Sequence, residues 1–130
     1  APSRMQWFLR VNPDIVILAL GGNDGLRGLS VNHMKKNLGK AIKLASSKNI
    51  RVLLAGMQIP LNYGQDYTKS FRNAFYELAE QYQLPMIPFL LEDVGNIPNL
   101  NLPDGIHPNP EGHQIISRTV IENLEPLLSN

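Results

Sequence analysis

The fold of this chain is decided by residues 14–24, which read Asp14-Ile15-Val16-Ile17-Leu18-Ala19-Leu20-Gly21-Gly22-Asn23-Asp24. The run from Ile15 to Leu20 is apolar throughout, which is typical of a strand buried on both faces of a parallel sheet. Two glycines end the run, and turn-forming residues follow them. The stretch therefore predicts a core strand whose carboxyl end carries small and polar side chains.

Helices are expected on both sides of this strand in the sequence. A helix through Met5–Arg10 should end before Asn12-Pro13, because the residue preceding a proline disfavours helical geometry. After the strand, Ser30 is a candidate N-cap for a helix with apolar residues at helical spacing. Those residues are Val31, Met34, Leu38, Ala41, Ile42 and Ala45.

The rest of the chain repeats this alternation. Ile50–Ala55 predicts a second strand, and Asp66 is a candidate cap for a helix with an apolar stripe from Tyr67 to Tyr82. Leu84–Phe89 predicts a short strand near a sheet edge, because two prolines flank its centre. Asn109-Pro110 should start a last helix. We expect its buried stripe to be Ile115, Ile116, Thr119, Val120 and Leu124.

Alternating helices and strands predict an α/β fold with a parallel sheet. In such sheets, sites lie at the carboxyl ends of the strands. In this chain those ends are residues 21–24, residues 56–63 and the loop that leads to residues 104–107. We therefore expect all the loops with chemically interesting side chains to lie on one rim of the sheet.

Composition limits the classes of function. The 130 residues suit one domain or part of one, and their net charge of +1 gives no electrostatic case for binding nucleic acid. The absence of cysteine excludes a thiol nucleophile and a Cys-ligated zinc site. No apolar run reaches the roughly 18–20 residues that span a bilayer, so stable membrane insertion is not expected. A local basic run at Lys35, Lys36, Lys40 and Lys43 is interpreted as a solvated helix face.

Asp104 and His107 are the first candidates for catalysis. They lie in the stretch Asp104-Gly105-Ile106-His107-Pro108-Asn109. A histidine three residues after an aspartate can act as a general base, with the carboxylate fixing the tautomer of the imidazole. The alternative is a loop histidine in an Asp-Gly turn before a proline-capped helix. The predicted position on the rim favours the catalytic interpretation.

Asn23 is the second candidate. Its side-chain amide could donate to a developing oxyanion, and Gly22 beside it would allow close approach of a substrate. The alternative is an ordinary strand-to-helix turn, for which Gly, Asn and Asp are the usual residues. The turn residues alone favour this second interpretation.

Weaker candidates lie elsewhere. Met57, Ile59, Leu61 and Tyr63 stand at period two after the second strand, where they could line an apolar substrate pocket or pack the loop. His33 and His113 lie within expected helices and are interpreted as surface residues. No metal site is predicted, because no clear third ligand accompanies Asp104 and His107.

Two motifs and their spacing together resemble the SGNH (GDSL-type) hydrolase family. They are Gly21-Gly22-Asn23-Asp24 after an apolar strand and the Asp104–Asn109 stretch before the last helix. Residues 20–28, 58–64 and 85–89 are similar to the bacterial thioesterase I/arylesterase/lysophospholipase subgroup. The resemblance covers essentially the whole chain.

The resemblance implies a flavodoxin-like three-layer α/β/α sandwich and hydrolysis of carboxylic esters or thioesters through an acyl-enzyme on serine. It implies that His107 is the base, Asp104 its acid partner and Asn23 an oxyanion-hole donor. The expected substrate is a small acyl ester or thioester, with no cofactor or metal. A role in lipid metabolism and a periplasmic or secreted location follow from the subgroup alone.

One family element has no counterpart in residues 1–130. The family's nucleophile lies in a Gly-Asp-Ser block at the end of its first strand, and no serine here has that context. The serines of this chain are Ser3, Ser30, Ser46, Ser47, Ser70, Ser117 and Ser129. We therefore expect residues 1–130 to be the C-terminal portion of a single SGNH domain that lacks its N-terminal strands. The nucleophile should come from the missing N-terminal segment, and the chain alone should be inactive.

Physics supports this expectation, because without further strands the run from Ile15 to Leu20 would form an exposed, hydrophobic sheet edge. Two alternatives stay open. The chain could be a catalytically inactive α/β binding scaffold, or the protein could be a carbohydrate acetylesterase, an activity that the same family also supports.

Overall fold

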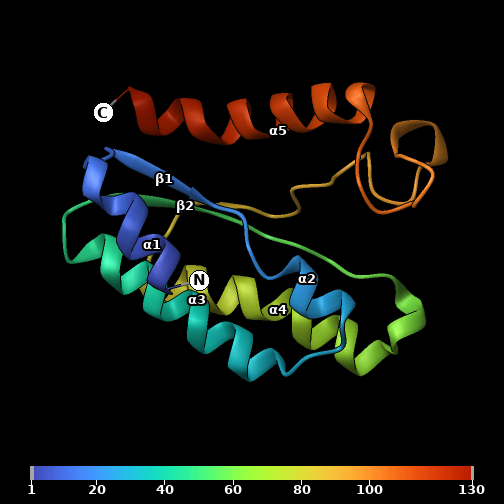
Figure 1. Cartoon of the computed structure of the whole chain (residues 1–130), viewed down its shortest axis with the longest axis horizontal. Coiled ribbons are helices and arrows are strands. Elements are labelled where there is room, and N and C mark those ends of the chain that lie inside the picture. The colour runs from blue at the N-terminus through green and yellow to red at the C-terminus, as the bar shows by residue number, and fades with distance from the viewer. Residues whose placement is uncertain (1, 130) are drawn as a thin grey trace. The chain divides into compact units, whose positions relative to one another are not determined.

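A computed structural model describes residues 2–129 of the chain (Figure 1). It contains two compact units, Ala1–Pro88 and Phe89–Asn130, which we describe separately. The first unit holds the sheet and most of the helices, and the second holds a long loop and the last helix.

The sheet of the first unit has three parallel strands, as the sequence predicts. They are β1 (Ile15–Leu18), β2 (Arg51–Ala55) and β3 (Met86–Ile87), in the order β1-β2-β3. Ile15 is paired with Arg51 and Leu18 with Leu54, which sets the register of β1 against β2. β3 has only two residues, consistent with the restriction that Pro85 and Pro88 impose on either side of it.

β1 lies at the edge of this sheet and pairs with β2 on one side. It is only partly buried, and Ile17 is 40% exposed. The expectation that a strand of this composition is covered on both faces is therefore wrong for β1. The described residues instead show the exposed sheet edge that the sequence predicts in the absence of further strands.

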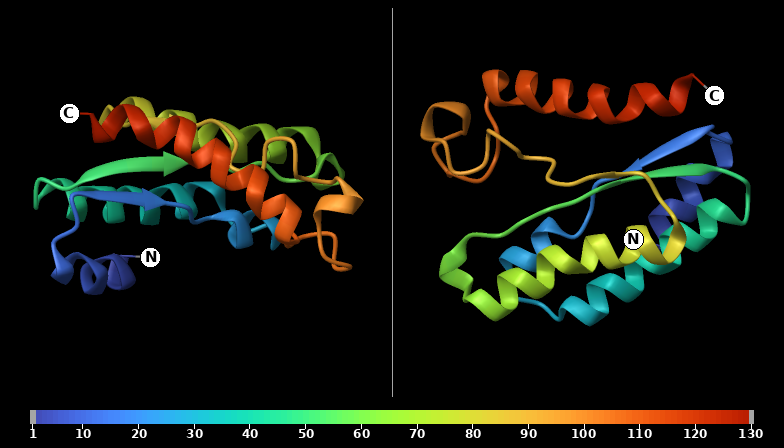
Figure 2. Two further views of the ribbon diagram at one scale, coloured as in Figure 1. Left: turned by 90° about the horizontal axis from the view of Figure 1, so that it is seen from above. Right: turned by 180° about the vertical axis from the view of Figure 1, so that it is seen from behind.

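Three helices pack on one face of the sheet, side by side in the order α1, α3, α4 (Figures 1 and 2). Their bounds are α1 Pro2–Phe8, α3 Val31–Ser46 and α4 Gln65–Tyr82. A short 3₁₀ turn, η1 (Leu9–Val11), continues α1. The apolar stripes predicted for α3 and α4 form the core together with Val52 and Leu54 of β2 and with Met5 and Leu9.

The expected helix caps are partly confirmed. Ser30 caps α3, because its hydroxyl accepts a hydrogen bond from the backbone N–H of His33 at 3.2 Å. Asp66 does not cap α4. That helix begins one residue earlier, at Gln65 after Gly64, and Asp66 lies in its first turn, where its negative charge still favours the helix dipole.

A short helix, α2 (Gly22–Leu26), was not expected from the sequence. It follows β1 directly and carries Asn23 in its first turn. A second 3₁₀ turn, η2 (Leu61–Tyr63), lies in the loop after β2. These two segments carry most of the candidate residues of the first unit.

The second unit is organised around α5 (Pro110–Leu128) and a 3₁₀ turn, η3 (Pro98–Leu100). Asn109 caps α5 as predicted and accepts from the backbone N–H of Gly112 at 2.9 Å. A Cβ on Gly112 would lie 2.3 Å from the carbonyl oxygen of Leu100, so the start of α5 needs glycine at this close approach. All five residues of the predicted stripe of α5 are half-buried, and Gly112 is buried.

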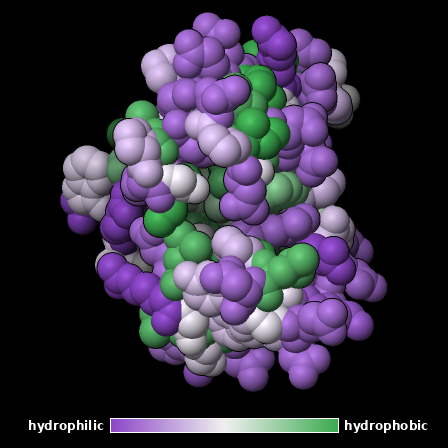
Figure 3. All heavy atoms as spheres, turned by 90° about the vertical axis from the view of Figure 1, so that its right-hand side faces the viewer, coloured by the Kyte–Doolittle hydropathy of each residue, from purple (hydrophilic) through white to green (hydrophobic). Residues whose placement is uncertain are grey.

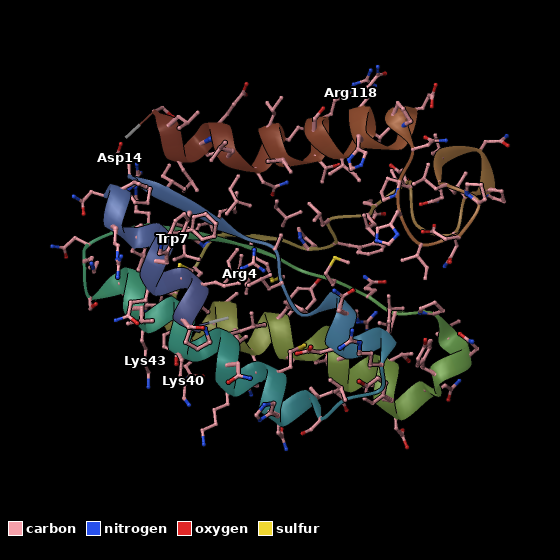
Figure 4. All side chains as sticks on the ribbon, in the orientation of Figure 1. Arg4, Trp7, Asp14, Lys40, Lys43 and Arg118 are labelled. Atoms are coloured by element: carbon pink, nitrogen blue, oxygen red, sulfur yellow. The ribbon has the colours of Figure 1, made fainter. Side chains whose placement is uncertain are left out.

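The basic run of α3 is a solvated face, as predicted. Lys40 and Lys43 project from α3 away from the sheet (Figure 4). Lys35 makes an ion pair with Glu77 of α4. Across residues 2–129, no helix is both long enough and apolar enough to cross a membrane.

Candidate functional site

Asp104 and His107 form a hydrogen-bonded pair in the second unit. The distance from His107 Nδ1 to Asp104 Oδ2 is 2.6 Å. The other carboxylate oxygen, Oδ1, accepts from the backbone N–H groups of Ile106 (2.8 Å) and His107 (3.0 Å). Both oxygens of Asp104 are therefore engaged, and the carboxylate fixes both the backbone turn and the imidazole.

The loop that carries this pair is held at several points. Asn101 is buried, and its side-chain amide donates to the carbonyl oxygens of Val94 (2.8 Å) and Ile97 (2.9 Å). Leu102 N–H donates to the carbonyl oxygen of His107 at 2.7 Å, which closes the loop just before α5. Gly105 occupies φ +69°, a conformation that glycine adopts without strain. Asn101 was not singled out from the sequence, and its Asn-rich surroundings gave no signal for it.

The electrostatics of the pair suit a base held by an anion. The His107 side chain, which hydrogen-bonds to Asp104, is the main cause that lowers the pKa of that carboxyl to about 2, and the two backbone N–H donors add to it. Asp104 is therefore ionised at neutral pH. With Nδ1 of His107 held by a carboxylate acceptor, Nε2 is the nitrogen left for proton transfer. The His107 side chain is 70% exposed, so that nitrogen is open to a reactant.

Asn23 lies at the carboxyl end of β1, in the first turn of α2, and is exposed. Gly21 precedes α2 at φ +100°, and a Cβ there would lie 2.9 Å from Met34 Sδ, so glycine is needed at this turn. Gly22 lies close to Met57, because a Cβ on Gly22 would come within 3.3 Å of Met57 Cε. Two of the predicted substrate-binding residues, Gly22 and Met57, are thus neighbours of each other, and Gly22 directly precedes Asn23 in the chain.

The other two predicted substrate-binding residues differ in position. Ile59 is buried, and a Cβ on Gly25 of α2 would lie 2.8 Å from its Cγ2, so the structure favours the packing interpretation for Ile59. Tyr63 is 36% exposed and donates its hydroxyl hydrogen to the carbonyl oxygen of Leu26 at 2.8 Å. Figure 3 views the molecule from the right-hand side of Figure 1. The side chains on this face are a mixture of apolar and polar groups.

Tyr67 was interpreted from the sequence only as part of the apolar stripe of α4. Its hydroxyl donates to the carbonyl oxygen of Leu29 at 2.6 Å. Burial is the main cause that raises the pKa of Tyr67, and the negative charge of Asp24 and the neighbouring Tyr63 raise it further. A tyrosine in the apolar stripe of a helix gives no signal in the sequence that its hydroxyl bonds to another segment.

The described serines lie in positions without the context of a nucleophile at a strand end. Ser30 caps α3, and Ser117 lies within α5, where its hydroxyl donates to the carbonyl oxygen of Gln114. Among residues 2–129 there is also no group of three or more His, Cys, Asp or Glu side chains that could hold a metal ion. His33 and His113 are exposed on α3 and α5, as predicted.

The sequence predicts that Asn23, which belongs to the first unit, and the Asp104–His107 pair of the second lie on one rim. The structure defines the local geometry within each unit. The convergence of the three side chains stays a prediction.

Comparison with known proteins identifies relatives that match most of the chain. A sequence model of the GDSL-like lipase/acylhydrolase family matches residues 1–115. Esterase TesA of Pseudomonas aeruginosa is 37% identical over 116 residues, which are 89% of this chain and 58% of that protein. Thioesterase 1/protease 1/lysophospholipase L1 of Escherichia coli K12 is 33% identical over 118 residues, which are 91% of this chain and 57% of that protein. The chain therefore spans less than two thirds of the length of these curated relatives.

A solved structure is similar to this chain in fold as well as in sequence. The crystal structure of TesA matches with a TM-score of 0.92 and 35% identity, over 97% of this chain and 71% of that one. This match confirms the predicted α/β fold class.

Proposed function

The chain belongs to the GDSL-like lipase/acylhydrolase family, and from this premise we propose that the protein hydrolyses carboxylic esters or thioesters through an acyl-enzyme on serine. The observation that carries the proposal is the Asp104–His107 pair, with its 2.6 Å hydrogen bond and its free Nε2. The names of the relatives, which include an esterase and a thioesterase/lysophospholipase, support an acyl ester or thioester as the substrate.

In the proposed reaction, His107 Nε2 takes the proton of the serine hydroxyl as the oxygen attacks the acyl carbon. The imidazolium that forms is stabilised by the ionised Asp104, which also keeps the ring in the correct tautomer. His107 then returns the proton to the leaving alcohol or thiol. In the second half of the cycle His107 activates a water molecule in the same way, and the acid is released.

Asn23 supplies a hydrogen-bond donor for the negative charge that develops on the carbonyl oxygen. A side-chain amide at the start of a short helix is suited to this role, because the helix N-terminus favours negative charge nearby. Gly22, next to Asn23, leaves room for the acyl group, and Met57 provides apolar surface beside it.

The nucleophile is proposed to come from an N-terminal segment of the same domain, either as preceding residues or as a separate chain. The described serines lack the strand-end context that the chemistry requires. Residues 1–130 alone are therefore expected to hydrolyse esters at background rate.

The proposed docking surface for that segment is the edge of β1. Beside the edge is a groove of about 380 Å³ whose walls include Met5, Phe8 and Val11 on one side and Val16 and Ile17 on the other. Phe8 is 51% and Val11 79% exposed, an apolar surface that an added strand and its side chains would cover.

A second candidate function is an α/β binding scaffold without catalysis. The observation that favours it is the absence of a Gly-Asp-Ser block in residues 1–130. This candidate predicts no ester hydrolysis under any condition, so one kinetic experiment separates the two.

The experiment measures hydrolysis of a short-chain p-nitrophenyl ester by the complete protein, meaning residues 1–130 together with the proposed N-terminal segment. His107→Ala should lower kcat by at least about 10³-fold, because the general base is lost. His113→Ala is the matched control, since His113 is exposed on α5 in the same unit, and it should leave kcat unchanged. Equal activity of both variants would remove His107 from the mechanism, and no hydrolysis by the unmodified protein would favour the scaffold.

A further inference from the structure

The strongest unexplained feature of the first unit is the support of α2. This helix has five residues, two of them glycine, and such a short helix is marginal by itself. The hydrogen bonds at its ends include Gly25 N–H to Gly21 O and Arg27 N–H to Asn23 O, each 3.0 Å. Its conformation must therefore depend on contacts with other elements.

Two tyrosine hydroxyls provide such contacts. Tyr63 OH donates to the carbonyl oxygen of Leu26 at 2.8 Å, and Tyr67 OH donates to that of Leu29 at 2.6 Å. One acceptor is the last residue of α2 and the other lies three residues beyond it. Both donors come from the segment after β2, Tyr63 from η2 and Tyr67 from the first turn of α4.

The donors are themselves firmly placed. Gly64, between them, has φ +94° and accepts at its carbonyl oxygen from Thr68 N–H at 3.0 Å. Thr68 is buried, and its hydroxyl donates to the carbonyl oxygen of Gln65 at 3.0 Å. The turn from η2 into α4 is therefore a rigid base for the two phenols.

Apolar packing also holds the middle of α2. Gly25 is buried, and a Cβ at this position would lie 2.6 Å from Phe71 Cε2 and 2.8 Å from Ile59 Cγ2. The helix backbone thus rests directly on side chains of α4 and of the loop after β2. Hydrogen bonds at its carboxyl end and packing in its middle leave α2 little freedom to rotate.

We propose that Tyr63 and Tyr67 are positioning residues that clamp α2 and thereby aim the Asn23 amide at the oxyanion. The inference rests on the proposed function for the role of Asn23, but the clamp itself rests on the hydrogen bonds and packing described above. It assigns the loop after β2 a task in catalysis besides lining a substrate pocket. The clamp requires both hydroxyls and leaves the reacting atoms untouched.

The clamp is tested first without catalysis. Amide hydrogen exchange of residues 25–29 should be faster in Tyr67→Phe and in Tyr63→Phe than in the unmodified complete protein, because each variant loses one hydrogen bond. Tyr76→Phe is the matched control, since Tyr76 is exposed on the same helix α4 as Tyr67. Unchanged exchange in both clamp variants would overturn the proposal whatever Asn23 does.

The catalytic consequence is tested in the complete protein. Tyr67→Phe should lower kcat by about three- to tenfold, with KM nearly constant, because a misaimed donor weakens transition-state binding. In an Asn23→Ala background the same substitution should have no further effect on kcat, because the two residues act through one interaction.

The two results separate the clamp from the proposed function. An equal loss of kcat on Tyr67→Phe with and without Asn23 would show a general structural effect and contradict the positioning role. If Asn23→Ala itself leaves kcat unchanged, the oxyanion assignment fails, while faster exchange in the clamp variants would still establish the clamp.

Discussion

Gly25→Ala is expected to destabilise the first unit through steric conflict. The new methyl group would lie 2.6 and 2.7 Å from two ring atoms of Phe71 and 2.8 Å from Ile59, whereas optimal contacts between carbon atoms are about 3.5–4.0 Å. Phe71 is fully buried and packs edge-on against Phe75, with ring centroids 5.4 Å apart, so its ring cannot simply move away.

The size of the effect follows from two opposing terms. Overpacking of a buried site costs about 1–3 kcal/mol. Alanine is a better helix former than glycine by about 1 kcal/mol, which offsets part of that cost. We therefore expect a net loss of up to about 2 kcal/mol in the free energy of unfolding.

Urea denaturation of the complete protein measures this loss. With an m-value of about 2 kcal/mol per molar, the midpoint should fall by up to about 1 M. The decisive comparison is made in a Phe71→Leu background, where the smaller side chain relieves the conflict. There Gly25→Ala should cost much less. The same cost in both backgrounds would refute the steric argument.

Three further predictions concern the second unit. Asp104→Asn should lower kcat of the complete protein by up to about 10⁴-fold, because an amide no longer selects the Nδ1–H tautomer of His107, and the pH profile of ester hydrolysis measures it. Because the pKa of Asp104 is lowered from 3.8 to about 2, its contribution to stability is present above pH 3.8 and is lost as the pH falls toward 2. NMR shifts of loop 101–109 should follow that window in the unmodified chain and not in Asp104→Asn. Gly112→Ala should destabilise the start of α5, because its Cβ would meet the Leu100 carbonyl oxygen at 2.3 Å, and faster amide exchange there than in Ser117→Ala would show it.

The sequence predicted the regular elements well where periodicity and caps agree. The strands at residues 15 and 51 and the caps at Ser30 and Asn109 follow from local chemistry that tertiary contacts reinforce. The Asp104–His107 hydrogen bond was also expected, because a spacing of three residues in an Asp-Gly turn brings the two side chains together.

The features that were missed depend on tertiary contacts. α2 contains two glycines, so propensity argues against a helix, and its backbone is held by Tyr63, Tyr67 and packing against Gly25. Ile59 follows the same period as Met57, yet it is buried because α2 lies on it. No spacing rule within one segment contains this information.

The central claim is that Asp104, His107 and Asn23 serve a serine outside residues 1–130. The most direct measurement is labelling of the complete protein with a fluorophosphonate probe, which phosphonylates an activated serine with loss of fluoride, followed by mass spectrometry of the labelled peptide. The account predicts one labelled serine in the N-terminal segment and loss of the label in His107→Ala. A label on any serine of residues 1–130, or undiminished labelling in His107→Ala, would contradict it.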